Sequence, residues 1–263
     1  MNPLPRISIV TPSFNQANFL TRTIESVLSQ DYPDLEYIII DGGSADGSRK
    51  IIRQYENRLA YLESIPDKGQ TDAINKGFTR ASGKYLAWLN SDDVYHPGAI
   101  AEAVTFLDNH SDVGMVYGDC DFIDAQDRKI GTFPAAQTDY QRLRRGYVHI
   151  PQQASFFRAS LWQKVGPLDP GFYFAMDYDL WVRLAGQAPL VYLPGHVWAS
   201  FRLHGEAKTI AADAHCWPEM LRVHYREGGH WLSPIVLKYG LRRLMAPLIN
   251  WRRRRMINKG QQE

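Results

Sequence analysis

Short apolar stretches alternate with helical patterns along the first ninety residues of this chain. Strands are expected at 7–10, which is rich in β-branched residues, and at 36–40 and 60–65, and an apolar and aromatic run follows at 85–89. Helices are expected between them at 17–30, from the end of the turn at 41–47 to about residue 58, and at 70–81, and apolar residues at helical spacing are clearest at 17–30. Strands that alternate with helices form right-handed βαβ units around a parallel sheet. The sequence therefore predicts an α/β fold.

The second half of the chain has the same kinds of element in a less regular order. A hairpin-like excursion is expected at 118–130, and a polar, basic surface segment at 138–146. Strands are expected at 113–117, 152–157, 190–193 and 197–203, and helices at 96–109, 160–165 and 177–186.

Four of the predicted strands end in polar or acidic residues. In open α/β sheets, ligands bind just beyond the carboxyl ends of the strands. Asp92 and Asp93, which follow the strand at 85–89, are suited to hold a hard cation and through it a diphosphate. The alternative is an ordinary turn, because Asn, Ser and Asp are common where strands end. The four polar strand ends lie at 11–15, 41–46, 67–69 and 90–93. Turn propensity alone does not explain polar and acidic residues at all four.

Length and cysteine usage narrow the class of protein further. A chain of 263 residues is long enough for one large α/β domain with an appendage. Cys120 and Cys216 form neither a disulfide framework nor a metal-ligand spacing, so we expect free thiols in a reducing compartment. The first residues do not resemble a signal peptide, and no apolar run reaches the roughly 20 residues that span a bilayer. We therefore expect a cytoplasmic protein.

The positive charge of the chain is concentrated in its last segment. The net charge is +2, yet 233–263 contains eight basic residues and one acidic residue, so the remainder is acidic. Trp251 precedes four arginines in this segment, and five apolar residues recur at helical spacing. A basic amphipathic helix suits an anionic membrane surface; alternatively, its apolar stripe packs on the domain. Nucleic acid is not expected as a partner, because the acidic body offers no matching basic face. The apolar residues of the stripe are Leu237, Leu241, Leu244, Met245 and Leu248.

Together these motifs resemble the family 2 glycosyltransferases, inverting enzymes that use nucleotide-activated sugars. The resemblance covers about 5–205 and implies the GT-A fold, a Rossmann-like, mixed and mainly parallel sheet flanked by helices. It further implies a glycosyltransferase domain at 1–205, with a nucleotide-binding half at 1–120 and an acceptor half at 121–205. The basic helical extension would occupy 206–263.

The resemblance also assigns residues to the nucleotide-sugar donor. Asp41 matches the carboxylate that accepts a hydrogen bond from the base, although Gly42 stands where many relatives carry a second acid. Asn90 stands where the first Asp of the family's metal motif often lies, which implies weaker metal binding and more reliance on the nucleotide. The donor-binding residues implied are Thr11, Pro12, Ser13, Asn15, Asp41, Asp67, Lys68, Asn75, Asp92 and Arg202. The residues implied for the metal, Mn²⁺ or Mg²⁺, are Asp93, Asp92 and His204.

Inversion requires a general base that deprotonates the acceptor hydroxyl. Asp177 resembles the family's catalytic Asp, with Met176 in place of the usual Glu. Asp is also a favoured helix N-cap, so a plain capping role is the alternative. Asp179 is the second candidate for the base. Gln152 and Gln153 lie in a stretch that resembles the acceptor side.

The resulting hypothesis is an inverting, metal-dependent glycosyltransferase at the inner face of the plasma membrane. Its acceptor would be a saccharide, and by analogy a lipid-linked one used in bacterial surface polysaccharide synthesis. Two alternatives stay open: a non-catalytic nucleotide-sugar-binding or scaffold protein of the same fold, and a sugar nucleotidyltransferase. The latter would need a Gly-rich, Arg-containing phosphate loop after the first strand, which 11–15 does not provide.

Overall fold

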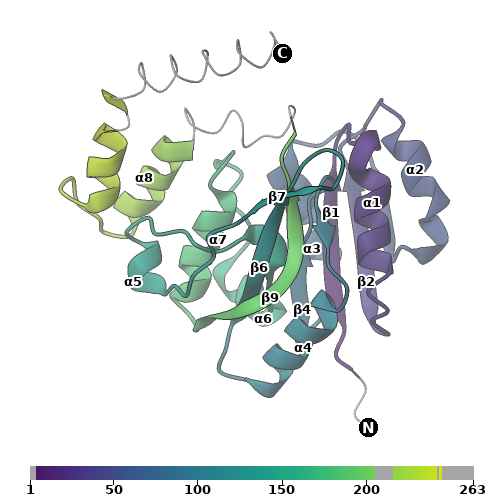
Figure 1. Ribbon diagram of the computed structural model, residues 1–263, viewed down its shortest axis with the longest axis horizontal. Coiled ribbons are helices and arrows are strands. Elements are labelled where there is room, and N and C mark those ends of the chain that lie inside the picture. Colours follow the sequence, from purple (N-terminus) through teal and green to yellow (C-terminus); the bar gives the residue numbers. More distant parts are fainter. Residues whose placement is uncertain (1–3, 205–215, 242, 245–263) are drawn as a thin grey trace.

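One mixed sheet runs through the computed structural model, which describes residues 4–204, 216–241, 243 and 244 (Figure 1). Within these residues the sheet has nine strands. Their order is β3 (Tyr61–Ser64), β2 (Leu35–Asp41), β1 (Ile7–Ser13), β4 (Tyr85–Trp88), β8 (Ser155–Arg158), β6 (Met115–Ile123), β9 (Leu190–Arg202) and β5 (Val94–Tyr95), with β7 (Lys129–Thr132) paired to β6.

The strands β3, β2, β1 and β4 are parallel neighbours, as the sequence predicts. Ser13 at the end of β1 pairs with Asp41 at the end of β2, which in turn pairs with Ser64 at the end of β3. The polar strand ends therefore meet at one edge. Beyond β4 the sheet becomes mixed, because β8 is antiparallel to both β4 and β6, while β6 and β9 are parallel.

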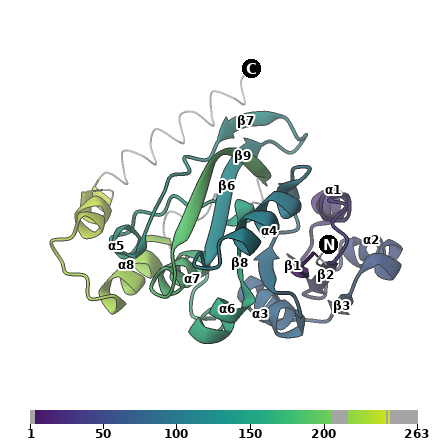
Figure 2. The ribbon, with the colours of Figure 1, turned by 90° about the horizontal axis from the view of Figure 1, so that it is seen from below.

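Helices cover both faces of the sheet (Figure 2). Side chains alternate along β1, so that Ile7 and Ile9 join one apolar cluster and Val10 joins the other. Buried residues of α1 (Ala17–Leu28), α2 (Ser48–Gln54) and α4 (Ala99–Asn109) complete the first cluster. The second cluster is completed by buried residues of α3 (Gln70–Arg80), α5 (Tyr140–Leu143), α7 (Met176–Ala185) and α8 (Cys216–Arg226). Partly buried residues of α6 (Ala159–Val165) pack against it.

The helix α3 lies unusually close to the sheet. A Cβ atom at Gly77 would lie only 2.4 Å from Val10 Cγ1, so this position requires glycine. The next residue, Phe78, packs edge-on against Trp88, and Trp181 of α7 stacks on the same indole with ring centroids 5.5 Å apart. Both helices are therefore fixed directly on β4, the strand that leads to Asp92 and Asp93.

Three predicted boundaries differ from the structure. A single strand, β9, replaces the two predicted strands at 190–193 and 197–203. Gly195 has φ +83°, and its N–H donates to Asp119. The pairing of β6 with β9 shifts register at this point. A β-bulge therefore lets one strand continue where the sequence predicts a break between two. The predicted strand at 152–157 begins with a 3₁₀ turn, η2 (Gln152–Ala154), and the predicted helix after residue 47 ends in another, η1 (Glu56–Arg58).

The last described residues form a second helical segment after α8, at 234–241. Ile235 is buried and lies against Gly146, whereas Leu237, Leu241 and Leu244 are 58%, 60% and 81% exposed. These three leucines of the predicted stripe therefore do not pack on the domain. Met245, Leu248 and Trp251 lie outside the described residues, together with the arginines at 252–255. None of the described helices is long and apolar enough to cross a membrane.

Candidate active site

The end of β1 contributes three of the predicted donor-binding residues, Thr11, Pro12 and Ser13. The hydroxyl of Thr11 contacts Tyr37 Oη at 3.0 Å and is buried, and Pro12 is buried as well. Ser13 Oγ is buried and has no hydrogen-bond partner within the part of the chain that the structure describes. Because such an atom is costly to leave unpaired, Ser13 is better placed than Thr11 to receive a polar ligand.

Asp41 organises the loop that follows β2. Its buried carboxylate accepts hydrogen bonds from the N–H groups of Gly43 and Ser44 and from the hydroxyls of Ser44 and Ser64. Asn15, in the left-handed region at φ 52°, holds the same loop through Ser44 Oγ at 2.8 Å and the N–H of Ala45 at 3.0 Å. A carboxylate with four donors has little capacity left. The predicted contact of Asp41 with the base stays a prediction.

Asp67 lies against the glycine that replaces the family's second acidic residue. A Cβ atom at Gly42 would be 2.9 Å from Asp67 Oδ2. Asp67 Oδ1 also accepts the N–H of Gly69 at 2.8 Å. A carboxylate is therefore present beside position 42, although it comes from a different strand end. Lys68, the predicted phosphate contact, is exposed, and its N–H donates to Asp72 at 3.1 Å.

An amide network surrounds the residues that follow β4. Asn90 Nδ2 donates to Asp93 Oδ2 and to Gln152 Oε1, both at 3.2 Å, and Asn90 Oδ1 accepts from Gln70 at 2.7 Å. Gln153 Nε2 donates to the same oxygen of Asp93 at 3.0 Å. This network requires an amide at position 90, because an ionised carboxylate could not donate hydrogen bonds to Asp93 and Gln152. No pattern in the sequence indicated that Gln70 takes part in this network.

Asp92 and Asp93 have different environments. Asp93 is fully buried, and its Oδ1 accepts the N–H of Arg202 at 2.9 Å. Burial, followed by the negative charge of Asp92, raises the pKa of Asp93 well above its usual range. The side chain of Asp92 is 16% exposed, and its Oδ2 lies 3.0 Å from His204 Nε2. Of the two carboxylates, Asp92 is therefore the more accessible to a ligand.

The guanidinium of Arg202 is buried beside these carboxylates. Its Nε donates to the carbonyl oxygen of Asp92 at 2.7 Å, and its Nη1 donates to the carbonyl oxygen of Asp124 at 2.9 Å and pairs with Asp127. Nη2 has no hydrogen-bond partner among the described residues. A buried cation with an unused donor is suited to an anionic ligand such as a diphosphate.

The donor set at Asp92 and His204 fits a divalent metal in part. A carboxylate oxygen and an imidazole nitrogen face each other, and the His204 ring packs on Phe19 at 4.5 Å between centroids. The described residues contain no group of three or more His, Cys, Asp or Glu side chains that could hold an ion by themselves. Such an ion would therefore need further oxygen ligands, which a nucleotide diphosphate and water can supply.

The helix α7 brings Asp177 to the same edge of the sheet. Met176 Sδ accepts a hydrogen bond from the Thr71 hydroxyl at 2.9 Å, and Thr71 lies at the start of α3, just beyond the end of β3. One turn after Asp177, Trp181 stacks on Trp88. The start of α7 therefore lies beside the strand ends. Asp177 is partly exposed, and its Oδ1 accepts the N–H of Tyr178 at 2.7 Å.

The structure argues against both alternatives to a catalytic Asp177. The N-cap of α7 is Ala175, and Glu219 of α8 accepts the N–H groups of the residues that precede the helix, so Asp177 is not its cap. Asp179 is fully buried and forms ion pairs with Arg183 and Arg226, so it is not a free base. The sequence pattern offered no signal for Glu219.

Asn75 contacts the loop that precedes α7. Its Nδ2 donates to the Leu168 carbonyl oxygen and its Oδ1 accepts the Leu168 N–H, both at 2.9 Å. These bonds explain the presence of an Asn at this position without any donor contact. The predicted role of Asn75 in donor binding is not needed to account for the residue.

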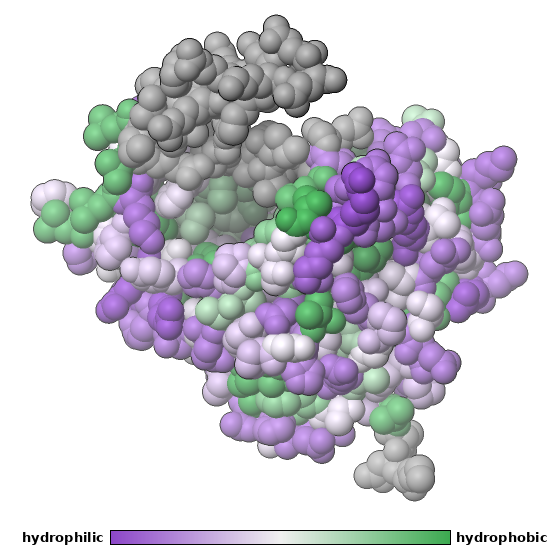
Figure 3. Space-filling view, viewed as in Figure 1, coloured by the Kyte–Doolittle hydropathy of each residue, from purple (hydrophilic) through white to green (hydrophobic). Residues whose placement is uncertain are grey.

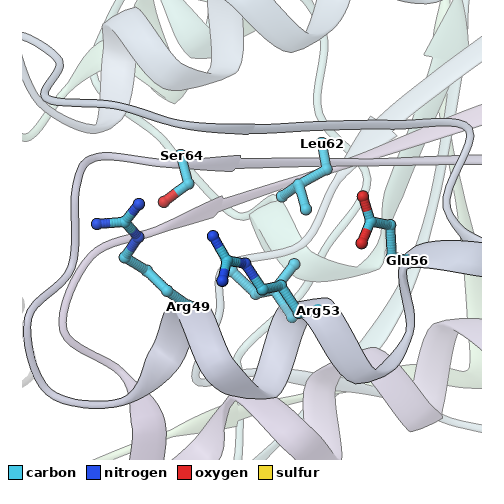
Figure 4. Close-up of a pocket in the computed structure, with 6 residues that line it drawn as sticks. Arg49, Arg53, Glu56, Leu62 and Ser64 are labelled. Atoms are coloured by element: carbon cyan, nitrogen blue, oxygen red, sulfur yellow. The ribbon is translucent and has the colours of Figure 1, made fainter.

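A basic pocket of about 220 Å³ lies on the outer side of β3 (Figure 4). Arg49 and Arg53 project from α2 towards Leu62 and Ser64 of β3. Ser64 Oγ is 2.6 Å from Asp41 Oδ2, so the pocket adjoins the loop after β2. Asp92, Asp93 and Asp177 do not line it.

The fold and the polar strand ends are those expected of a glycosyltransferase of the GT-A type, and comparison with known proteins agrees. Residues 8–166 match the model of glycosyl transferase family 2. An uncharacterized glycosyltransferase of Mycobacterium tuberculosis is 37% identical over 188 residues, which cover 70% of this chain and 71% of the relative. The chain belongs to glycosyl transferase family 2, and we conclude that it is a glycosyltransferase.

A second relative matches almost end to end. The PGL/p-HBAD biosynthesis glycosyltransferase of Mycobacterium bovis is 28% identical over 260 residues, covering 95% of this chain and 99% of the relative. Among solved structures, S. aureus TarS 1–349 in complex with UDP superposes with a TM-score of 0.68 at 16% identity, over 92% of this chain and 72% of that one. Mannosyltransferase PcManGT from Pyrobaculum calidifontis, in complex with GDP-Man and Mn²⁺, gives 0.64 at 19% identity, over 88% and 68%. The GT-A fold predicted from the sequence is thereby confirmed.

Proposed function

We propose that this chain transfers a sugar from a nucleotide-sugar donor to a saccharide acceptor with inversion at the anomeric carbon. The observation that supports the proposal best is the placement of α7. Its start lies beside the strand ends, so that Asp177 and the pair of Asp92 and His204 share one edge of the sheet. The solved relatives with bound UDP and GDP-Man have the same fold.

In the proposed mechanism, Asp177 is the general base that accepts the proton of the acceptor hydroxyl. Asp92 and His204 would hold the divalent metal, which supplies charge stabilisation to the leaving diphosphate. Arg202 would direct its unpaired Nη2 towards the same diphosphate. Asp93, which the sequence comparison with the family assigned to the metal, would instead position neighbouring groups. Its carboxylate accepts the N–H of Arg202 and the side-chain amides of Asn90 and Gln153.

The presence of an imidazole favours Mn²⁺ over Mg²⁺. Mg²⁺ prefers oxygen ligands, whereas Mn²⁺ accepts nitrogen more readily. The Mn²⁺ in the complex of PcManGT is consistent with this choice.

We further propose that the acceptor is lipid-linked and that the chain works at an anionic membrane surface on the cytoplasmic side. Apolar side chains gather over the helical segment at 234–241, at the left of Figure 3. Leu237, Leu241 and Leu244 are exposed there beside the basic residues Lys238 and Arg243. The M. bovis relative, named for PGL/p-HBAD biosynthesis, is similar over its whole length, including this region.

Turnover with defined donors tests the catalytic proposal. The full chain is incubated with UDP-, GDP- and dTDP-sugars, Mn²⁺ and candidate lipid-linked acceptors, and release of nucleoside diphosphate is measured. We expect metal-dependent release with one donor, a product of inverted anomeric configuration by NMR, and a loss of at least about a hundredfold with Asp177→Asn. Retained configuration would refute inversion, and an active Asp177→Asn variant would refute the base. Tight donor binding without turnover would favour a scaffold protein.

Vesicle flotation tests the membrane proposal. We expect the chain to float with vesicles containing phosphatidylglycerol, and to float less with vesicles of phosphatidylcholine alone. Leu237→Glu should abolish flotation, whereas the exposed control Ile130→Glu, on β7, should not. A chain that stays with the soluble fraction under both conditions would refute this part of the proposal.

A further inference from the structure

The loop before α7 is held by a carboxylate from a helix much later in the chain. Glu219 Oε1 accepts the N–H of Tyr173 at 2.9 Å, and Glu219 Oε2 accepts the N–H groups of Phe174 and Ala175, both at 2.8 Å. Three consecutive backbone donors thus converge on one side chain. Asp177 follows two residues after the last of them.

This contact lies at the N-terminus of α7, a helix without a side-chain N-cap. The N-cap residue Ala175 has no side chain that could accept a hydrogen bond. The carboxylate of Glu219 accepts the N–H of this N-cap residue, as the Glu of a capping box does, and its negative charge interacts favourably with the positive end of the helix dipole. The conformation of 173–175 therefore depends on α8 and not on the local sequence.

Other contacts of α8 fix the position of Glu219. Arg222 donates to Asp169 at 2.6 Å and to the Gly171 carbonyl oxygen at 3.2 Å, and its guanidinium lies 4.0 Å from the centre of the Phe172 ring. Arg226 forms an ion pair with the buried Asp179 of α7. The helix α8 therefore contacts the segment 169–179 on both sides of Asp177.

The opposite side of this loop is held from the donor half. Asn75 pairs with both backbone groups of Leu168, and the Thr71 hydroxyl contacts Met176 Sδ. The loop is thus fixed between α3 and α8, and the contacts from α8 reach the backbone of 173–175.

We infer that Glu219 is a positioning residue, which holds the start of α7 so that Asp177 faces the acceptor hydroxyl. The inference rests on the proposed role of Asp177 as the general base. Glu219 lies outside 8–166, the segment that matches the family model, so the acceptor side of this chain depends on its own C-terminal region. A displacement of the base by about 1 Å lowers the rate of a positioned reaction by about a hundredfold.

The test compares the full-length chain with Glu219→Gln, Glu219→Ala and the control Glu227→Gln. Glu227 follows the same helix, and its carboxylate contacts Tyr140 and Arg226 but not the loop before α7. Hydrogen exchange of the amides at 173–175 is measured together with kcat and the KM for the donor. We expect faster exchange at these amides, kcat lower by about 10- to 100-fold and an unchanged donor KM, with a larger effect for Glu219→Ala than for Glu219→Gln. Glu227→Gln should match the wild type.

The possible outcomes are distinguishable. Unchanged exchange in Glu219→Ala would overturn the contact, and faster exchange with unchanged kcat would overturn the positioning role alone. A fall in donor binding equal to the fall in kcat would also overturn it, because a general loss of structure would then explain the result. A wild-type chain that transfers no sugar would refute the proposed function, and the positioning role with it.

Discussion

The substitution Asn90→Asp tests the amide network at the end of β4. It restores the acidic residue that often begins the family's metal motif. Asn90 Nδ2 donates to Asp93 and to Gln152, and an ionised carboxylate can make neither bond. Each lost bond costs about 1–2 kcal/mol.

Charge repulsion adds to this loss. The new carboxylate would lie near 3.2 Å from Asp93 Oδ2, the distance of the present hydrogen bond. Two unit charges at this separation repel by about 5 kcal/mol at an effective dielectric constant of 20, which is an upper limit. Because burial raises the pKa of Asp93, the two carboxyl groups can share a proton and relieve much of the repulsion. We therefore expect the free energy of unfolding to fall by about 2–4 kcal/mol without metal.

Urea unfolding at neutral pH, with and without MnCl₂, measures this effect. The control Asn57→Asp makes the same chemical change at an exposed position and should shift stability by less than about 0.5 kcal/mol. Mn²⁺ should stabilise Asn90→Asp more than the wild type, since it neutralises the added charge. An Asn90→Asp variant as stable as the wild type in the absence of metal would refute the network. Equal stabilisation by Mn²⁺ would refute the link between Asn90 and weak metal binding.

Three further predictions follow from individual contacts. His204→Ala should raise the Mn²⁺ concentration for half-maximal turnover by at least about tenfold, and an unchanged value in a metal titration would remove His204 from the metal site. Asn75→Ala leaves both backbone groups of the buried Leu168 unpaired, so the free energy of unfolding in urea should fall by about 2–4 kcal/mol; a neutral effect would show that water replaces the amide. Gly42→Ala should push the Asp67 carboxylate away from the Gly69 N–H and lower the free energy of unfolding by about 1 kcal/mol in the same assay. This loss of stability should vanish in an Asp67→Ala background. Additive effects of the two substitutions would contradict the contact.

The first half of the fold was predictable because its signals are local. The apolar runs, the helical spacing and the polar strand ends are all visible in the sequence, and the handedness of βαβ units leaves few ways to connect them. The parallel order of β3, β2, β1 and β4 and the mixed α/β class follow from these signals and are confirmed. The bulge that makes β9 one strand was missed, because a Pro-Gly pair more often ends a strand than bends one.

The candidate site was predictable only as a set of residues. The sequence placed Asp92, Asp93, Asp177 and His204 in one site, and the family comparison supports the activity that they imply. The prediction put Asp93 on the metal itself and Asp92 towards the ribose and the metal, because the burial by which the two carboxylates differ is not visible in the sequence. Asp93 is enclosed by donors from β9, η2 and the end of β4, and these segments are distant in sequence.

By itself, the sequence determined the fold class, the edge of the sheet that carries polar residues and the family of the protein. These depend on patterns within about thirty residues and on short motifs. The tertiary structure decided which carboxylate stays accessible, which amides surround Asn90 and which side chain holds the backbone just before α7. Each of these depends on groups that folding brings together from separate parts of the chain. The contact of Glu219 with the loop before α7 is the clearest case, because neither segment's sequence predicts a contact with the other.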